Sequence, residues 1–122
     1  HGRIDDADAL FALARETAEL PEDRAGGWIG GAIVAATRRR LGEAEADYRR
    51  ALALAPDFPP ALERYGNLLL FMDRAAEAAP LLQRLTERRP GDPQAWRLYA
   101  VALAKLGRID EARGAERRAA GR

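Results

Sequence analysis

The sequence lacks several residue types that carry enzyme chemistry. It has no cysteine and no serine, and its single histidine is the first residue, His1, where it resembles the remnant of a purification tag. These absences exclude disulfides, thiolate zinc sites and cysteine or serine nucleophiles. Acidic residues are plentiful, but they cluster where they favour the first turns of helices. We therefore expect a protein that is not an enzyme and has no catalytic residue, metal site or cofactor.

Long apolar runs and an excess of one charge are missing as well. The longest apolar stretch, WIGGAIVAA, is about half of the ~20 residues that a membrane-spanning helix needs. Charged residues make up 32% of the chain, yet the net charge is only +1. That balance argues against binding to nucleic acid or to anionic lipid. We expect a soluble protein of the cytoplasm or the periplasm, with no membrane insertion.

Helix-forming residues dominate what is present. The chain has 27 alanines, and 19 of its 20 basic residues are arginine. Alanine, leucine, arginine and glutamate are strong helix formers, whereas aromatic residues amount to only 7%. The composition predicts an all-α fold, and 122 residues suit one small domain.

The phrase GRID occurs near both ends of the chain and marks an internal repeat. Pro56 and Pro90 lie 34 residues apart, and at this period small or apolar residues align in columns. The opening segment joins the same columns after a spacing of 37 residues. The columns are Ile4, Leu41, Ala75 and Ile109; Ala7, Ala44, Ala78 and Ala112; Ala14, Ala51, Leu85 and Ala119; and Trp28, Leu62 and Trp96.

Each repeat is interpreted as two helices. In the middle repeat, Pro59 and Pro60 open the first helix, and Asp73 is expected to cap the second. Pro80 lies inside that second helix and predicts a kink. Gly107 is expected to end the first helix of the last repeat. In the first repeat, either Gly26 and Gly27 precede the helix, or the glycines around Trp28 permit close packing.

The pattern resembles the tetratricopeptide repeat (TPR), a helix–turn–helix of 34 residues, and in particular a bacterial-type TPR domain. The last repeat carries its signature in Trp96, Tyr99, Ala100 and Leu103, and the middle repeat in Leu62, Tyr65, Gly66 and Leu69. The resemblance implies a right-handed α-solenoid of antiparallel helix pairs with about seven helices. It divides a single domain, residues 1–122, into an orphan second helix (2–20), repeat 1 (25–58), repeat 2 (59–92) and a truncated or capping repeat 3 (93–122).

The resemblance also implies a function. First helices of TPR units line a concave groove that takes a peptide or a partner helix. The groove residues carried over to this chain are Ile29, Ile33, Glu63, Asn67, Leu70, Phe71, Gln94, Arg97, Val101 and Lys105. Some family members clamp the carboxyl terminus of chaperones with lysine, asparagine and arginine. Ile29, Ile33 and Arg64 stand at clamp positions here, so we expect a different protein or peptide ligand.

Two alternatives to a stand-alone scaffold remain. The chain is interpreted either as an accessory repeat domain of a larger protein, such as a sulfotransferase, a glycosyltransferase or an envelope or assembly protein, or as a module that associates with itself to form a homo-oligomer.

Overall fold

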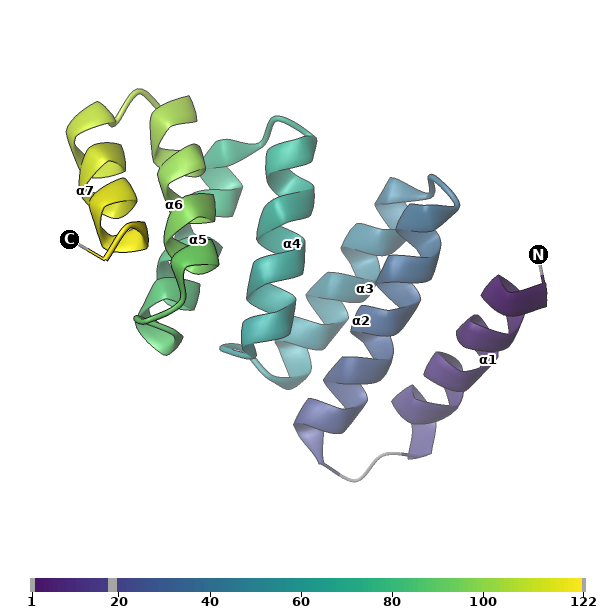
Figure 1. Cartoon of the computed structure of the whole chain (residues 1–122). Coiled ribbons are helices and arrows are strands. Elements are labelled where there is room, and N and C mark those ends of the chain that lie inside the picture. Colours follow the sequence, from purple (N-terminus) through teal and green to yellow (C-terminus); the bar gives the residue numbers. More distant parts are fainter. Residues whose placement is uncertain (1, 18–19, 122) are drawn as a thin grey trace. The chain divides into compact units, whose positions relative to one another are not determined.

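The computed structural model describes residues 2–17 and 20–121, which fold into seven α-helices without a strand among them (Figure 1). His1 lies outside the described residues, as do the side chains of Ile4 and Ala14. The helices are α1 (Gly2–Thr17), α2 (Pro21–Thr37), α3 (Leu41–Leu54), α4 (Pro59–Phe71), α5 (Ala75–Arg88), α6 (Pro93–Lys105) and α7 (Ile109–Ala119). The all-α prediction is confirmed. The helices form two compact units, His1–Ala61 and Leu62–Arg122, and the division into numbered repeats stays a prediction.

In the first unit, α2 packs against both α1 and α3. All four glycines around Trp28 lie inside α2, which begins at Pro21, so the alternative in which Gly26 and Gly27 precede the helix is wrong. A Cβ atom on Gly27 would lie 2.8 Å from the backbone nitrogen of Arg15 and 2.9 Å from the carbonyl oxygen of Phe11. The glycines therefore let the backbones of α1 and α2 approach closely.

In the second unit, α5 packs against α6 and α6 against α7. Five leucines are almost completely buried: Leu62, Leu69, Leu82, Leu85 and Leu103. Gly66 makes room for Leu82, whose side chain would lie 2.6 Å from a Cβ atom at that position. Trp96 is half-buried against the cluster that Leu103 forms with its neighbours, and its indole N–H donates to the carbonyl of Pro90 at 2.8 Å. Large and small side chains thus alternate across the helix contacts.

The same tight turn follows α2, α4 and α6. At its centre stand Arg39, Asp73 and Gly107, spaced by the repeat period, with positive φ angles of 64°, 59° and 79°. The next N–H in each turn donates five residues back, as from Arg108 to the carbonyl of Leu103 at 2.9 Å. This is the Schellman arrangement, which satisfies the last carbonyls of a helix. The expected helix stop at Gly107 is confirmed.

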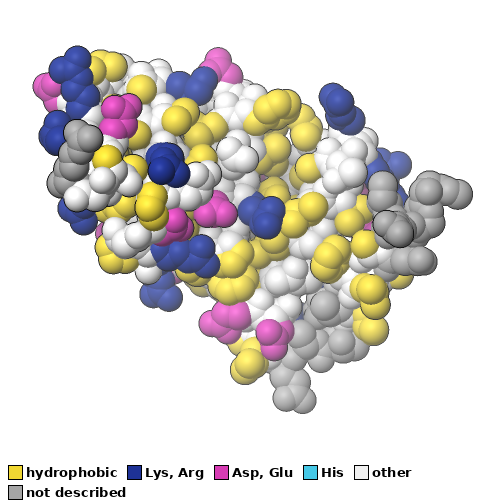
Figure 2. All heavy atoms as spheres, in the orientation of Figure 1, with side chains coloured by type: hydrophobic (Ala, Val, Ile, Leu, Met, Phe, Trp, Pro, Cys, Tyr) yellow, Lys and Arg dark blue, Asp and Glu magenta, His cyan; other side chains and the backbone are white. Residues whose placement is uncertain are grey.

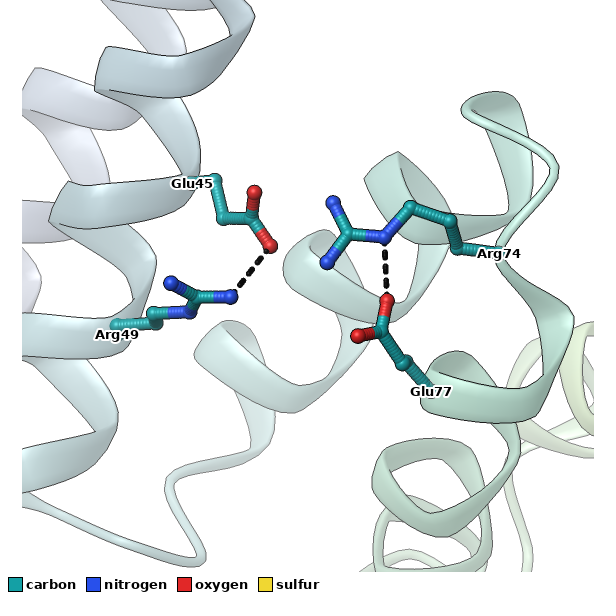
Figure 3. Close-up of polar contacts among 4 residues, drawn as sticks. All are labelled: Glu45, Arg49, Arg74 and Glu77. Carbon is teal, nitrogen blue, oxygen red and sulfur yellow. Dashed lines mark hydrogen bonds and ion pairs between the residues drawn. The ribbon is translucent and has the colours of Figure 1, made fainter.

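The second helix of each pair starts differently from the sequence-based expectation. The prediction that Asp73 caps α5 is wrong, because Asp73 occupies the turn and Arg74 precedes the helix. The Arg74 guanidinium pairs with Glu77, three residues on (Figure 3). Pairs at the same repeat positions open α3 and α7: Arg40 with Glu43 at 3.7 Å, and Arg108 with Glu111 at 2.5 Å. Acidic groups in the first turn favour the helix dipole, and the arginine holds them there.

One proline begins α6, and another lies inside α5. Asp92 caps α6 by accepting a hydrogen bond from the backbone N–H of Gln94 at 3.0 Å, and Pro93 fills the first helical position. Pro80 lies within α5, which continues from Ala75 to Arg88 around it. Its ring faces solvent. The missing N–H therefore does not end the helix.

Candidate functional site

The predicted groove residues of the last repeat lie along α6. Gln94, Arg97, Val101 and Lys105 are all exposed, and Val101 retains 45% of its accessible surface although it is apolar. They follow one another at intervals of three or four residues, so they share one side of the helix. The side chain of Arg97 forms no hydrogen bond or ion pair with any residue that the structure describes.

Three of these residues line a shallow hollow of about 410 Å³, which we call the α6 hollow. It is lined by Arg97, Ala100, Val101, Ala104, Lys105 and Glu116. Its floor is made of alanine and valine side chains from α6, and its charged rim combines two basic residues with one glutamate from α7. An apolar floor with a mixed charged rim suits a side chain that is apolar next to an acidic group.

The predicted residues on α4 divide into exposed and buried ones. Phe71 is 76% exposed and Asn67 is exposed, whereas Leu70 is only 8% exposed and Glu63 is half-buried. The carboxylate of Asp73, two residues after Phe71, lies 3.8 Å from the ammonium group of Lys105. This ion pair places the end of α4 next to the end of α6. Leu70 contributes to packing, and Asn67 and Phe71 are the α4 residues that are open to a partner.

The first unit contributes less open surface to the predicted groove. Ile29 is only 6% exposed, and Ile33 is 37% exposed. Ile29 sits in α2, whose glycines draw the neighbouring helix in closely. Ile33 is thus the groove residue that this unit exposes.

Sequence reasoning missed a second, charged hollow in the first unit. It has a volume of about 350 Å³ and is lined by Asp8, Arg15, Trp28, Gly31, Val34, Ala35, Arg38, Arg40, Glu43, Ala46, Asp47 and Arg50. Asp47 is only 8% exposed. Burial raises the pKa of the Asp47 carboxyl, although the guanidinium groups of Arg15 and Arg50 act in the opposite direction. The available signal was Asp47 itself, an acidic residue in a repeat column that holds Leu81 and Ala115 elsewhere.

The described residues offer neither a metal site nor a membrane-spanning helix. On the face drawn in Figure 2, basic and acidic side chains are interspersed among apolar ones. Among the side chains that the structure describes, no three acidic or histidine groups come together as a metal site would require. None of the described helices combines the length and the hydrophobicity of a membrane span.

Comparison with known proteins identifies the repeat. A family model described as tetratricopeptide repeat matches residues 35–100 and, in a second placement, residues 72–115. The chain belongs to the tetratricopeptide repeat family. TPR units generally mediate protein–protein interaction and are typically not catalytic. No curated protein matches the chain.

A solved structure supports the same fold for this TPR chain. It is described as MamA RS-1 ArsTM double mutant, and it superposes with a TM-score of 0.81 at 22% sequence identity. The match covers 97% of this chain and 65% of that chain, so this chain spans less than two thirds of the MamA chain. At this identity the likeness establishes the fold alone.

Proposed function

We propose that this TPR domain is a protein-interaction module that binds a peptide or a partner helix along α4 and α6. The observation that carries the proposal is the α6 hollow, since three residues expected to face a partner, Arg97, Val101 and Lys105, line it together. A partner segment seated there would place an apolar side chain over Val101 and an acidic group against Arg97.

The neighbouring α4 residues extend this surface. Phe71 offers a large apolar side chain with most of its area exposed, and burial of such aromatic side chains often supplies much of the binding energy of an interface. Asn67 carries an amide whose N–H groups and carbonyl oxygen are suited to the backbone of an extended peptide. The ammonium group of Lys105 is paired with Asp73 at 3.8 Å, whereas the guanidinium group of Arg97 is available for a carboxylate.

Selection from a random peptide library tests the proposal. Peptides enriched on the unmodified protein are measured by fluorescence polarisation against a variant carrying Asn67→Ala, Phe71→Ala and Arg97→Ala. We expect acidic–apolar sequences to be enriched and to lose at least about tenfold in affinity, because interface anchors each contribute on the order of 2 kcal/mol.

The matched control replaces three exposed residues of α5 that lie outside the proposed surface: Gln83→Ala, Glu87→Ala and Arg88→Ala. This variant should bind the enriched peptides as the unmodified protein does. If both variants bind equally, or if no peptide is enriched, the assignment of the surface is wrong.

A further inference from the structure

The charged hollow of the first unit forms where two neighbouring positions depart from the residue types that the other repeats have there. Gly31 stands in the column that holds Tyr65 and Tyr99 in the other repeats, so no aromatic side chain fills the space beside it. Asp47 stands where an apolar residue is found in the other second helices. A Cβ atom on Gly31 would lie 3.1 Å from a carboxylate oxygen of Asp47, so both departures open onto the same space.

The acidic residues of this hollow are each held by an arginine. The Arg50 guanidinium donates to Asp47 at 3.2 Å, and Arg38 lies 3.8 Å from Asp8. On the rim, Arg40 lies 3.7 Å from Glu43. Four arginines and three acidic residues line the hollow, so these three pairs leave one guanidinium group in excess.

The guanidinium group outside these three pairs is that of Arg15, whose charge acts to lower the pKa of Asp47 without a direct ion pair. It reaches from α1 into the space beside Gly31, and it lies over the ring of Trp28 with its central carbon 4.4 Å from the ring centroid. Among the described residues its guanidinium N–H groups donate no hydrogen bond, and no carboxylate lies within ion-pair distance. Arg50 lies over the same ring at 4.7 Å. Two guanidinium groups therefore lie over Trp28. That of Arg15, which is half-buried, has N–H donors that no described residue accepts.

We propose that this hollow binds a small molecule that carries a carboxylate or phosphate group, with Arg15 as the main anion contact. Guanidinium groups bind both anions through paired, charge-assisted hydrogen bonds. The volume is that of a small-ligand site, and the ring of Trp28 holds the guanidinium groups of Arg15 and Arg50 at its wall. The proposal is independent of the peptide-binding surface, because every residue that lines the hollow belongs to the first unit.

The proposal is tested by NMR titration with two probes in separate arms, inorganic phosphate and glutarate. Sodium chloride at matched ionic strength is the reference. We expect saturable shifts at the indole N–H of Trp28, the Nε–H of Arg15 and the amide of Gly31, with one or both probes. The responding arm identifies the anion class. Shifts that sodium chloride reproduces, or that do not saturate with either probe, would overturn the proposal.

Variants with opposite expected effects separate binding from loss of structure. Arg15→Gln should weaken binding at least about tenfold, because it removes the charge that the other side chains leave in excess. Asp47→Ala, which introduces the residue found at the matching position 115, should strengthen binding severalfold, because Arg50 loses its carboxylate partner and Arg15 loses the negative charge nearest to it. A disrupted fold would not produce that gain, so unchanged or weaker binding by Asp47→Ala contradicts the proposal.

A matched arginine on the other unit provides the control. The Arg118 guanidinium lies 4.5 Å from the ring centroid of Trp96, at the repeat position that corresponds to Arg50 over Trp28. Arg118→Gln should leave both titrations unchanged, since its tryptophan lines a different part of the molecule. An equal loss with Arg118→Gln and Arg15→Gln would mean that the anions bind to surface arginines in general.

Discussion

At the scale of single residues, the turn after each first helix shows how a repeat position can demand a conformation without demanding a residue type. Arg39, Asp73 and Gly107 all adopt left-handed backbone angles. Glycine enters this region without cost, aspartate tolerates it, and arginine is strained there. The turn is therefore imposed by the helix pair around it.

Gly107→Ala should lower the free energy of unfolding by about 1–2 kcal/mol, because a Cβ atom is disfavoured at positive φ. The control is Gly91→Ala, at an exposed glycine with no neighbour near a Cβ atom and no positive φ. That change should be neutral or stabilising by up to about 1 kcal/mol. Urea unfolding followed by circular dichroism measures both, and equal effects would contradict the role assigned to the backbone angle.

The burial of Asp47 leads to a prediction, also at the scale of a single residue, about how stability depends on pH. Its pKa is raised mainly by burial, so the folded protein takes up a proton at a pH where the unfolded chain does not. The contribution of Asp47 to the free energy of unfolding should therefore rise as the pH falls through this raised pKa. Asp47→Asn removes the titration but leaves Arg15, Arg50 and Glu43 in place.

Urea unfolding at several pH values compares the two proteins. Lowering the pH from about 7 to about 4 should raise the unfolding free energy of the unmodified protein relative to that of Asp47→Asn. Exposed groups such as Glu111, whose pKa is lowered mainly by its hydrogen bond to Arg108, titrate in both proteins and cancel. If the difference in unfolding free energy stays constant, or if Asp47→Asn becomes relatively more stable at low pH, burial does not determine the pKa of this carboxyl.

At the scale of helices, α2 shows that the same residue type serves opposite purposes at adjacent positions. A Cβ atom on Gly27 would lie 2.8–2.9 Å from backbone atoms of α1, whereas a Cβ atom on Gly26 would meet nothing within 4 Å. One glycine sets the distance between two helices, and its neighbour only weakens the helix that contains it.

Gly27→Ala should destabilise the protein by about 1–3 kcal/mol, because backbone atoms of α1 cannot move aside without separating the helices. Gly26→Ala should stabilise it by up to about 1 kcal/mol through helix propensity. Thermal unfolding measures both, and limited proteolysis should show faster cleavage within α1 for Gly27→Ala alone. If the two alanine variants unfold alike, the close approach of α1 is not stabilising.

At the scale of the whole molecule, contacts group into two units, each with its own buried side chains. Repeat proteins are stabilised by their helix pairs and by contacts between neighbours, so damage is expected to remain partly local. Leu103, only 1% exposed, is central to the packing of α6 and α7, whereas Leu106 three residues later is 38% exposed.

Leu103→Ala should cost about 2–5 kcal/mol and Leu106→Ala much less, since the first leaves a cavity and the second does not. Hydrogen exchange followed by mass spectrometry should show the largest loss of protection in α6 and α7 for Leu103→Ala, with a smaller loss in α2 and α3. An equal loss in every helix would mean that the chain unfolds as one cooperative block.

The sequence by itself determined the all-α class, the repeat and its family, because helix propensity and the spacing of small and large residues are local properties of the chain. It also located the stop at Gly107 and the exposed residues of α6. It failed at the start of α5, where Asp73 takes the turn and an arginine–glutamate pair opens the helix.

Only the tertiary structure decided which of the predicted groove residues are exposed to solvent, and which positions with a small residue leave a hollow beside them. Ile29 and Leu70 were assigned to the same groove as Val101 and Phe71, yet they are buried by neighbouring side chains. The hollow beside Gly31 depends on Arg15, Trp28 and Asp47, which come from three different helices. Spacing along a helix fixes the direction of a side chain, but its burial depends on what packs against it, and that is set by residues distant in sequence.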